Sequence, residues 1–418
     1  MSLSKHNKYM PTYDFPEEIL SEIFKSLPVK YLLRCLSVQK SWYHLIKSPM
    51  FVSLHLNHQK LTVHDNPKYL LFHNTKNHTF TVCTDDVQCQ EYCKLEYPFE
   101  FNGHEWCALS NGLICISSVL FRKPYYDPDI HIWNPLVQIR KTIRESPHSI
   151  LTPEEIDWKA LAFGYLPEVN DYVVVVAVKL EPDPPDPSDP DPPDPYEFNP
   201  NTVSIGVFSL NTSSWNFYFQ DDVYICAILT DRSVFVNGIA FWVAENFSGY
   251  RVVMYFDTKT EIMRDILVPD WLRIEERQFN DPFIYPLFYP YNQSIAYFGK
   301  NDESRHLDMW VLKQDMIDEF SWEKKMSVSL SENVWADVLG IRNNGDIILA
   351  KSNNLISYDL DTHEPYDFVN SCDCLTPSSH YFKTPSSSYE EGFKPPFLIT
   401  PFVETLLWRD IISSNTSD

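Results

Sequence analysis

The chain has 418 residues, of which 44% are hydrophobic and 15% aromatic, so apolar side chains suffice for a large core and a disordered protein is excluded. The formal net charge is −23; residues 1–60 carry +4 and the remainder carries −27. A negative field of that size repels phosphate groups, which argues against nucleic acid as a partner and favours a basic protein. Solubility alone is an equally good explanation of the charge.

No segment is typical of a membrane or secreted protein. The longest apolar run, residues 172–178, is far shorter than the ~20 residues that cross a bilayer, and the first fifteen residues are polar. The nine cysteines are an odd number in a chain with no export signal, which favours reduced thiols. We therefore expect no membrane partner and a location in the cytoplasm, the nucleus or both.

Residues 14–47 have the periodicity of helices. Asp14, Pro16 and Glu17 are typical of a helix start, because they supply a capping side chain, an early proline and an acid three residues on. The apolar positions that follow form one stripe: Ile19, Leu20, Ile23, Phe24 and Leu27. Pro28 ends this helix, and two more short helices are predicted at 29–38 and 41–46. Three helices this short bury too little surface to be stable alone, so they need a partner or a neighbouring domain. We expect a second polypeptide to cover the stripe.

After residue 60 the pattern changes to short β-branched and aromatic runs between turn residues. A hairpin that opens on Asn-Gly recurs at Asn111, Asn237 and Asn344, and this dipeptide favours tight turns because both residues accept a positive φ. Repeated hairpins without helical periodicity predict a radial β architecture, with two open β-sheets packed together as the alternative. The predicted units are 105–143, 160–219, 233–268, 290–328, 338–370 and a closing unit that pairs 68–72 with 397–400 and 403–408.

Two further segments stand out. Residues 181–195 (EPDPPDPSDPDPPDP) can form neither strand nor helix, so we expect an extended acidic surface loop within 181–200. This loop is either a tolerated insertion or a contact arm for a basic partner. Residues 280–291 (NDPFIYPLFYPY) combine aromatic side chains with prolines, and they either pack against one end of the β domain or bind substrate.

Sequence motifs of catalysis are missing from the chain. There is no G-x-S-x-G, H-E-x-x-H, Walker loop or G-x-G-x-x-G. The spacings of Cys83, Cys89 and Cys93 match no zinc-ligand pattern, and Cys372 and Cys374 do not make half of an ordinary zinc site. We therefore expect no catalytic residue, no metal and no cofactor.

The helical segment, over residues 10–55, resembles an F-box in the order and spacing of its apolar residues, although Phe15-Pro16 stands where that family commonly begins with Leu-Pro. The resemblance implies that the segment docks on a Skp-family adaptor. It assigns adaptor contact to eleven residues: Phe15, Pro16, Ile19, Leu20, Ile23, Phe24, Leu27, Pro28, Leu33, Val38 and Trp42. For Trp42, internal packing is an equally good explanation.

The predicted β domain spans residues 61–410, and over most of residues 100–360 it is similar to the F-box-associated domain of plant F-box proteins. The matching stretches are 110–116, 132–135, 163–165, 170–174, 207–210, 214–215 and 309–311. The first two together resemble the S-locus (self-incompatibility) group, whereas the paired glycines of kelch repeats are missing. The resemblance implies an α+β, mostly β protein: a three-helix F-box followed by a β-propeller-like domain of about six blades.

The same resemblance implies a function. It predicts a non-catalytic substrate-recognition subunit of a Skp–cullin–F-box ubiquitin ligase, joined through the adaptor to cullin and the RING protein. The β domain would select a protein substrate, possibly a basic one, through residues that the sequence does not identify. Two alternatives remain: an S-locus-type receptor that acts on a ribonuclease, and a propeller enzyme or ligand-binding protein with an incidental helical leader.

Overall fold

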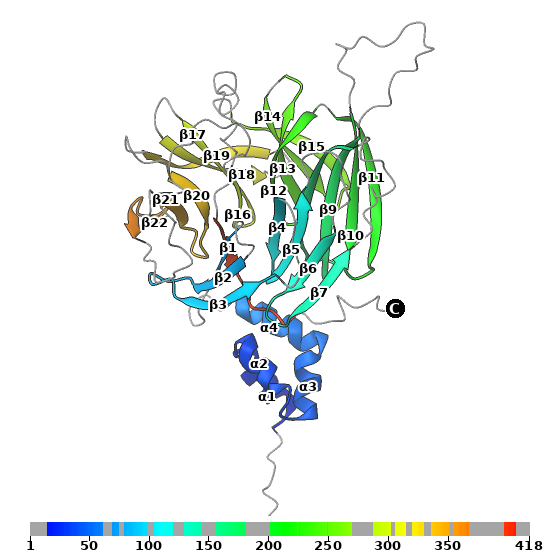
Figure 1. The fold of residues 1–418 in the computed structure, drawn as a ribbon, viewed down its shortest axis with the longest axis vertical. Coiled ribbons are helices and arrows are strands. Elements are labelled where there is room, and N and C mark those ends of the chain that lie inside the picture. The colour runs from blue at the N-terminus through cyan, green and yellow to red at the C-terminus, as the bar shows by residue number, and fades with distance from the viewer. Residues whose placement is uncertain are drawn as a thin grey trace, which may run out of the picture.

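The structure is a computed structural model in which a small helical segment lies at one end of a large β-rich body (Figure 1). The described residues are 15–61, 69–74, 79–97, 104–119, 129–143, 156–180, 201–223, 225–248, 250–269, 287–301, 306–314, 320–329, 336–351, 354–367 and 397–406. The predicted acidic loop at 181–200 and most of the aromatic segment 280–291 lie outside these ranges. In the ranges that are described, no helix is long and apolar enough to cross a membrane.

The helical segment has the three predicted helices and a fourth that is not predicted from the sequence. They are α1 (Glu17–Lys25), α2 (Val29–Cys35), α3 (Lys40–Lys47) and α4 (Pro49–Leu61). The missed helix is α4, which begins at Pro49 because the first position of a helix needs no backbone N–H donor. Ser48 precedes it and accepts the Phe51 N–H at 3.1 Å with its hydroxyl oxygen, as a helix cap does.

The β-rich body consists of six four-stranded antiparallel units, counted over the described residues. The first unit combines the last strand with the first three: β24 (Phe397–Phe402), β1 (Tyr69–Asn74), β2 (Thr79–Thr84) and β3 (Glu91–Glu96). The next two are β4 (His104–Ser110), β5 (Leu113–Val119), β6 (Ile130–Asn134) and β7 (Ile139–Ile143), then β8 (Ile156–Leu166), β9 (Asp171–Leu180), β10 (Asn201–Ser209) and β11 (Ser214–Val223).

The last three units follow in chain order. They are β12 (Ile225–Val236), β13 (Ile239–Asn246), β14 (Arg251–Asp257) and β15 (Ile262–Leu267); β16 (Leu287–Tyr291), β17 (Ser294–Asn301), β18 (His306–Gln314) and β19 (Phe320–Ser329); and β20 (Ala336–Ile341), β21 (Ile347–Lys351), β22 (Asn354–Tyr358) and β23 (Pro365–Asp367). The inner strand of each unit lies against that of the next from β4 to β24. The body is therefore propeller-like with six blades, as predicted, rather than a pair of packed sheets.

The two ends of the propeller domain meet in the first unit. β24 pairs antiparallel with β1, and Phe72 faces Ile399 in the register. The same β24 also touches the preceding unit, through a parallel bridge between Gly340 and Ile399. The approach there is so close that a Cβ on Gly340 would lie 1.9 Å from the Ile399 carbonyl oxygen. The predicted pairing of 68–72 with 397–400 is confirmed, whereas the described residues 403–406 of the predicted segment 403–408 form no strand.

Inner hairpins turn on asparagine in most units. Asn111, Asn170, Asn237 and Asn292 all have φ between 49° and 53°, the left-handed region that asparagine tolerates better than other non-glycine residues. Gly112 and Gly238 follow two of them, also with positive φ. The predicted Asn-Gly turns at Asn111 and Asn237 are thus confirmed.

The described end of the aromatic segment 280–291 belongs to β16. Phe288 and Tyr289 are buried there, and the Tyr289 hydroxyl donates a hydrogen bond to the Val338 carbonyl at 2.7 Å. These two aromatic side chains therefore pack between blades. Of the two predicted roles, packing and substrate binding, they have the packing role.

A buried ion pair fastens the last blade to the first. Arg342, after β20, donates from Nε to Asp85 Oδ1 at 2.7 Å, and both side chains are almost fully buried. Asp85 follows β2 and also accepts from the Asn343 N–H at 3.1 Å and from its side-chain amide at 2.7 Å. Arg342 Nη1 donates in addition to the Tyr366 hydroxyl at 2.6 Å. The closure is therefore polar at its rim as well as paired through the backbone.

Removing Arg342 tests this clasp. We expect Arg342→Leu to lower the free energy of unfolding by about 3 kcal/mol, because the Asp85 carboxylate would stay buried without its cation. The exposed Arg264 on β15 is the matched control, and Arg264→Leu should change stability by no more than about 0.5 kcal/mol. Chemical denaturation of both variants measures the difference, and equal losses would contradict a structural role for the pair.

Candidate functional site

The predicted apolar stripe of α1 divides into two rows. Leu20 and Phe24 face inward and are 8% and 3% exposed, whereas Ile19 and Ile23 are 48% and 47% exposed. Each pair is four residues apart, so each forms one row along the helix, and the two rows are neighbours around its axis. Phe15, which precedes the helix, is 57% exposed. We call Phe15, Ile19 and Ile23 the exposed apolar row.

The inward row builds the core of the helical segment. The Phe24 ring packs edge-on against the Trp42 ring at 5.0 Å and against the Phe51 ring at 6.5 Å, which joins α1 to α3 and α4. Such aromatic pairs add to the stability that burial already supplies. Leu20 and Phe24 therefore stabilise the helical bundle and expose almost no surface. Their burial argues against the predicted contact with an adaptor. Trp42 makes an internal packing contact, which is one of its two predicted roles.

The other predicted residues are distributed over both environments. Val38 is 63% exposed and Pro16 is exposed, whereas Leu27, Pro28 and Leu33 are half-buried. The structure thus exposes Ile19 and Ile23 on α1 and Phe15 just before it, and it separates them from the buried Leu20 and Phe24.

Three exposed apolar side chains were not predicted: Tyr31, Tyr43 and Met50. On α2, Val29 and Leu32 are fully buried, so the intervening Tyr31 points away from the core. That spacing was a usable signal, but Met50 lies on α4, which was itself missed. Seven of the fourteen large apolar side chains exposed among the described residues lie between Phe15 and Met50. The smallest part of the molecule therefore has a disproportionate share of its uncovered apolar surface.

Cations accompany the exposed tyrosines. The Arg34 guanidinium lies 5.6 Å from the centre of the Tyr31 ring. Lys47 Nζ lies 4.7 Å from the Tyr43 ring centre and donates to its hydroxyl at 3.0 Å. Lys30 and Lys40 are exposed nearby in the sequence. An apolar surface bordered by basic side chains suits an acidic partner that offers apolar pockets.

Comparison with known families matches both parts of the chain. The model of the F-box domain matches residues 13–54, and that of the F-box associated beta propeller domain matches residues 61–363. The chain belongs to this family of F-box proteins. The four helices are thus the F-box region of a family architecture rather than an incidental leader.

Curated relatives from Arabidopsis thaliana share the architecture. F-box protein At5g49610 is 26% identical over 62% of this chain and 66% of its own length. F-box protein CPR1 is 26% identical over 76% of this chain and 74% of its own length. The chain therefore spans about two thirds to three quarters of these relatives. Among solved structures, dipeptidyl peptidase 4 of Porphyromonas gingivalis has a TM-score of 0.38 at 10% identity, over 71% of this chain and 52% of that one, which carries no argument about function.

The described thiols and acids do not form a reactive centre. Cys83, Cys89 and Cys93 are unpaired thiols. Burial raises the pKa of Cys93 to about 11, and a hydrogen bond with Cys83 together with burial raises the pKa of Cys89. Thiols with raised pKa values are poor nucleophiles at neutral pH. Within the described ranges, no group of three or more His, Cys, Asp or Glu side chains could hold a metal ion.

His55 connects α4 to the end of α1 inside the F-box region. It is fully buried, and its Nε2 lies 2.9 Å from the Leu27 carbonyl oxygen, to which it donates as the Nε2–H tautomer. Burial lowers the pKa of His55 from its ordinary value of 6.5, and the neighbouring His58 lowers it further, against the effect of the Leu27 hydrogen bond. The neutral ring is therefore the form that the folded protein accommodates.

The F-box region should lose stability in mild acid. An unfolded histidine takes up a proton near pH 6.5 whereas folded His55 does so only at lower pH, so the unfolded state is favoured as the pH falls below about 6.5. We expect His55→Gln to flatten the fall in Tm between neutral pH and pH 5.5, because the amide can still donate to Leu27 but does not titrate. His44→Gln, at an exposed position on α3, is the control and should keep the slope of the unaltered protein. Identical slopes for all three proteins would exclude His55 as the titrating group.

Proposed function

We propose that this F-box protein is the non-catalytic substrate-recognition subunit of a Skp–cullin–F-box ubiquitin ligase. Its F-box docks on a Skp-family adaptor, which connects it to cullin and the RING protein, and its propeller domain selects the protein to be ubiquitinated. The proposal rests on the exposed apolar row, because its three large side chains face solvent within the region that matches the F-box domain. The proposed location is the cytoplasm, the nucleus or both, in keeping with six described cysteines that are free thiols.

The proposed adaptor contacts are narrower than the predicted set. We retain the exposed residues Phe15, Pro16, Ile19, Ile23 and Val38, together with the half-buried Leu27, Pro28 and Leu33. To these we add Tyr31, Tyr43 and Met50 as candidates, since they are exposed on the same region. Full burial of a large apolar side chain stabilises a complex by ~1.5–3 kcal/mol, so a few such anchors are sufficient for stable docking.

Charging the exposed apolar row tests adaptor docking directly. We expect Ile19→Asp combined with Ile23→Asp to weaken binding of a purified Skp-family adaptor at least a hundredfold, since both changes place a charge in an apolar contact. The Tm of the full chain should stay nearly constant, because both side chains are already half exposed. Titration calorimetry or surface plasmon resonance measures the affinity, and thermal melting checks the fold.

The control is Ile262→Asp, since Ile262 lies on β15 of the propeller and is 40% exposed. Its adaptor affinity should equal that of the unaltered chain. Retention of adaptor binding by the double variant would refute docking through α1, and failure of the unaltered chain to bind any Skp-family adaptor would refute the proposed function itself.

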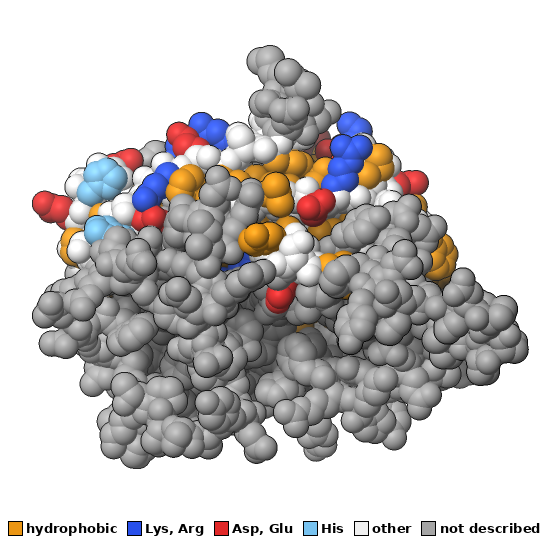
Figure 2. All heavy atoms as spheres, turned by 90° about the horizontal axis from the view of Figure 1, so that it is seen from above, with side chains coloured by type: hydrophobic (Ala, Val, Ile, Leu, Met, Phe, Trp, Pro, Cys, Tyr) orange, Lys and Arg blue, Asp and Glu red, His pale blue; other side chains and the backbone are white. Residues whose placement is uncertain are grey.

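Substrate selection is proposed for the end of the propeller away from the F-box. The F-box helices lie beside the blades formed by β24–β3 and β4–β7 (Figure 1), and the β4–β5 turn at Gly112 lies against Val403, in the segment that contacts the F-box. Since strands alternate in direction within each blade, the outer strand of one blade ends, and the inner strand of the next begins, at the end opposite the β4–β5 turn. Figure 2 shows the side of the molecule away from the F-box, where the described surface has apolar side chains and side chains of both charges.

The acidic charge supports a basic substrate, and an S-locus-type ribonuclease is the narrower form of this proposal. Attraction between opposite charges is screened by salt. If the substrate is such a ribonuclease, the affinity of the purified enzyme for the full chain should fall about tenfold from low to physiological salt, mainly through a slower association rate. Surface plasmon resonance measures both. An affinity that is indifferent to salt would contradict recognition by charge.

A further inference from the structure

The segment that follows β24 lies at the junction between the two domains. Residues 403–406 have no regular secondary structure, and Glu404, Thr405 and Leu406 are buried. We call residues 403–406 the C-terminal wedge. It follows directly from the strand that closes the propeller, and it lies against the F-box helices on its other side.

The wedge is attached to the propeller by close backbone contacts. Asn134, at the end of β6, donates from its side-chain amide to the Thr405 carbonyl at 3.2 Å. The Gly112 turn approaches so closely that an added Cβ would lie 2.1 Å from the Val403 carbonyl oxygen. Only glycine fits at that position, which also has a φ of +78°. The wedge is therefore fixed at the end of the β4–β7 blade that contains the β4–β5 turn and the end of β6.

Glu404 attaches the wedge to the F-box. Its Oε2 accepts the Val29 N–H at 2.9 Å in a buried environment. Val29 is the first residue of α2, and the preceding Pro28 makes no side-chain cap. The first N–H groups of a helix have no partner within the helix and need an external acceptor when they are buried. Glu404 supplies that acceptor from the far end of the chain.

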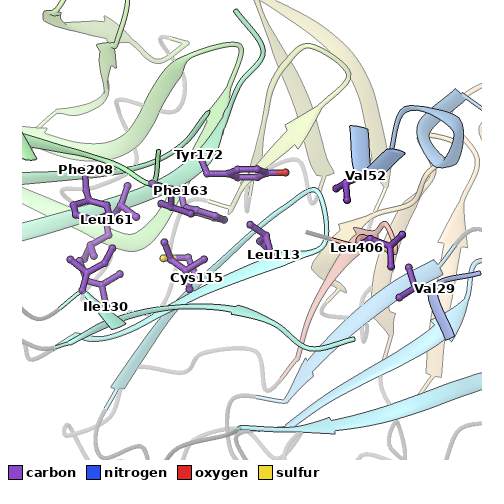
Figure 3. Packing of buried hydrophobic residues seen from close by; sticks show 14 of the residues in the cluster. Val29, Val52, Leu113, Cys115, Ile130, Leu161, Phe163, Tyr172, Phe208 and Leu406 are labelled. Atoms are coloured by element: carbon purple, nitrogen blue, oxygen red, sulfur yellow. The ribbon is translucent and has the colours of Figure 1, made fainter. Parts of the chain in front are cut away.

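Apolar contacts surround this hydrogen bond. Val29, Val52 and Leu406 come from α2, α4 and the wedge, and they gather at the junction in Figure 3. They belong to one hydrophobic cluster that continues through Leu113 and Cys115 into the β4–β7 blade. On the other side, the Tyr69 and Tyr92 rings lie 4.8 Å apart. Burial raises the pKa of both hydroxyls, and the nearby Glu404 raises it further. The carboxylate is thus enclosed by both domains.

We propose that the C-terminal wedge sets the orientation of the F-box on the propeller, with Glu404 as its positioning residue. The inference rests on the proposed function, because the adaptor bound to the F-box would then be held in one orientation relative to the end of the propeller that is proposed to select substrate. A single hydrogen-bonded acceptor selects one rotational position of α2, whereas apolar packing alone tolerates small rotations. The exposed apolar row takes no part in the junction. The orientation of the F-box and its affinity for an adaptor can therefore be changed separately.

The experiment compares Glu404→Ala with Glu404→Gln in the full chain. Labels for distance measurement are introduced as non-canonical residues at Ser41 on α3 and Lys259 in the β14–β15 turn, both of which are exposed, so the native cysteines stay unmodified. We expect the Ser41–Lys259 distance distribution to widen at least twofold in Glu404→Ala. In Glu404→Gln it should stay as narrow as in the unaltered chain, because the amide oxygen still accepts the Val29 N–H. Glu364→Ala, at an exposed turn residue, is the control and should change nothing.

Two readouts separate positioning from stability. The adaptor Kd of Glu404→Ala should stay within threefold of the unaltered value. In a reconstituted ligase, more lysines of the propeller should be ubiquitinated in Glu404→Ala than in the unaltered chain. In Glu404→Gln the ubiquitinated lysines should be the same as in the unaltered chain. An unchanged distance distribution in Glu404→Ala, with or without a lower Tm, would overturn the proposal. So would a loss of adaptor affinity that accompanies the widening, because it would indicate unfolding of the F-box.

The two proposals fail in different ways. If the unaltered chain binds no Skp-family adaptor, the proposed function fails, while the distance measurement, made without adaptor, still decides whether the wedge orients the F-box. If the adaptor binds but the distances do not respond to Glu404, only the wedge proposal fails.

Discussion

The pairing of β24 with β1 is the contact on which the rest of the architecture depends. It joins strands from opposite ends of the propeller domain, in a register that sets Phe72 opposite Ile399. Bringing such distant segments together costs chain entropy, which the long antiparallel ladder and the buried side chains offset. The pairing also covers edges of β24 and β1 that would otherwise attract other strands.

The closure extends beyond the propeller. The Arg342–Asp85 pair secures its rim, and the chain continues from β24 into the C-terminal wedge. Through Glu404 and Leu406 the same terminal segment reaches the F-box, so the first and the last described parts of the chain meet at one junction. A propeller that lacks its final strand would therefore lose both its closing ladder and the acceptor for α2.

The F-box has two surfaces, one packed against the propeller and one exposed. One surface contributes Val29, Leu32 and Val52 to a cluster that runs into the β4–β7 blade, which explains how so small a helical unit acquires a sufficient core. The other surface exposes Phe15, Ile19 and Ile23. Contiguous exposed apolar side chains mark interaction sites in folded proteins, and this surface is the one that the proposed adaptor would cover.

Much of the fold could be predicted because its signals are local. Asn-Gly dipeptides require positive φ wherever they occur, so the hairpins at Asn111 and Asn237 were visible in the sequence. The alternation of strands and turns predicted six units and their closure. Helix α4 was missed because Pro49 was taken as the end of the helical region, although proline is equally compatible with the first turn of a helix.

The candidate site was predicted only as a set, because periodicity identifies an apolar stripe but not what covers it. Ile19 and Leu20 are adjacent residues of one stripe, yet Leu20 is buried in the bundle and Ile19 is not. The same limit applies to Glu404, which no motif distinguishes from other acids of the chain. By itself, the amino-acid sequence determined the first three helices, the hairpins and the family resemblance, since each depends on residues close together in the chain, and its composition determined the sign of the charge. Only the tertiary structure decided which apolar row is left for a partner and which carboxylate caps α2, because burial and distant hydrogen bonds depend on segments that meet only after the propeller has closed.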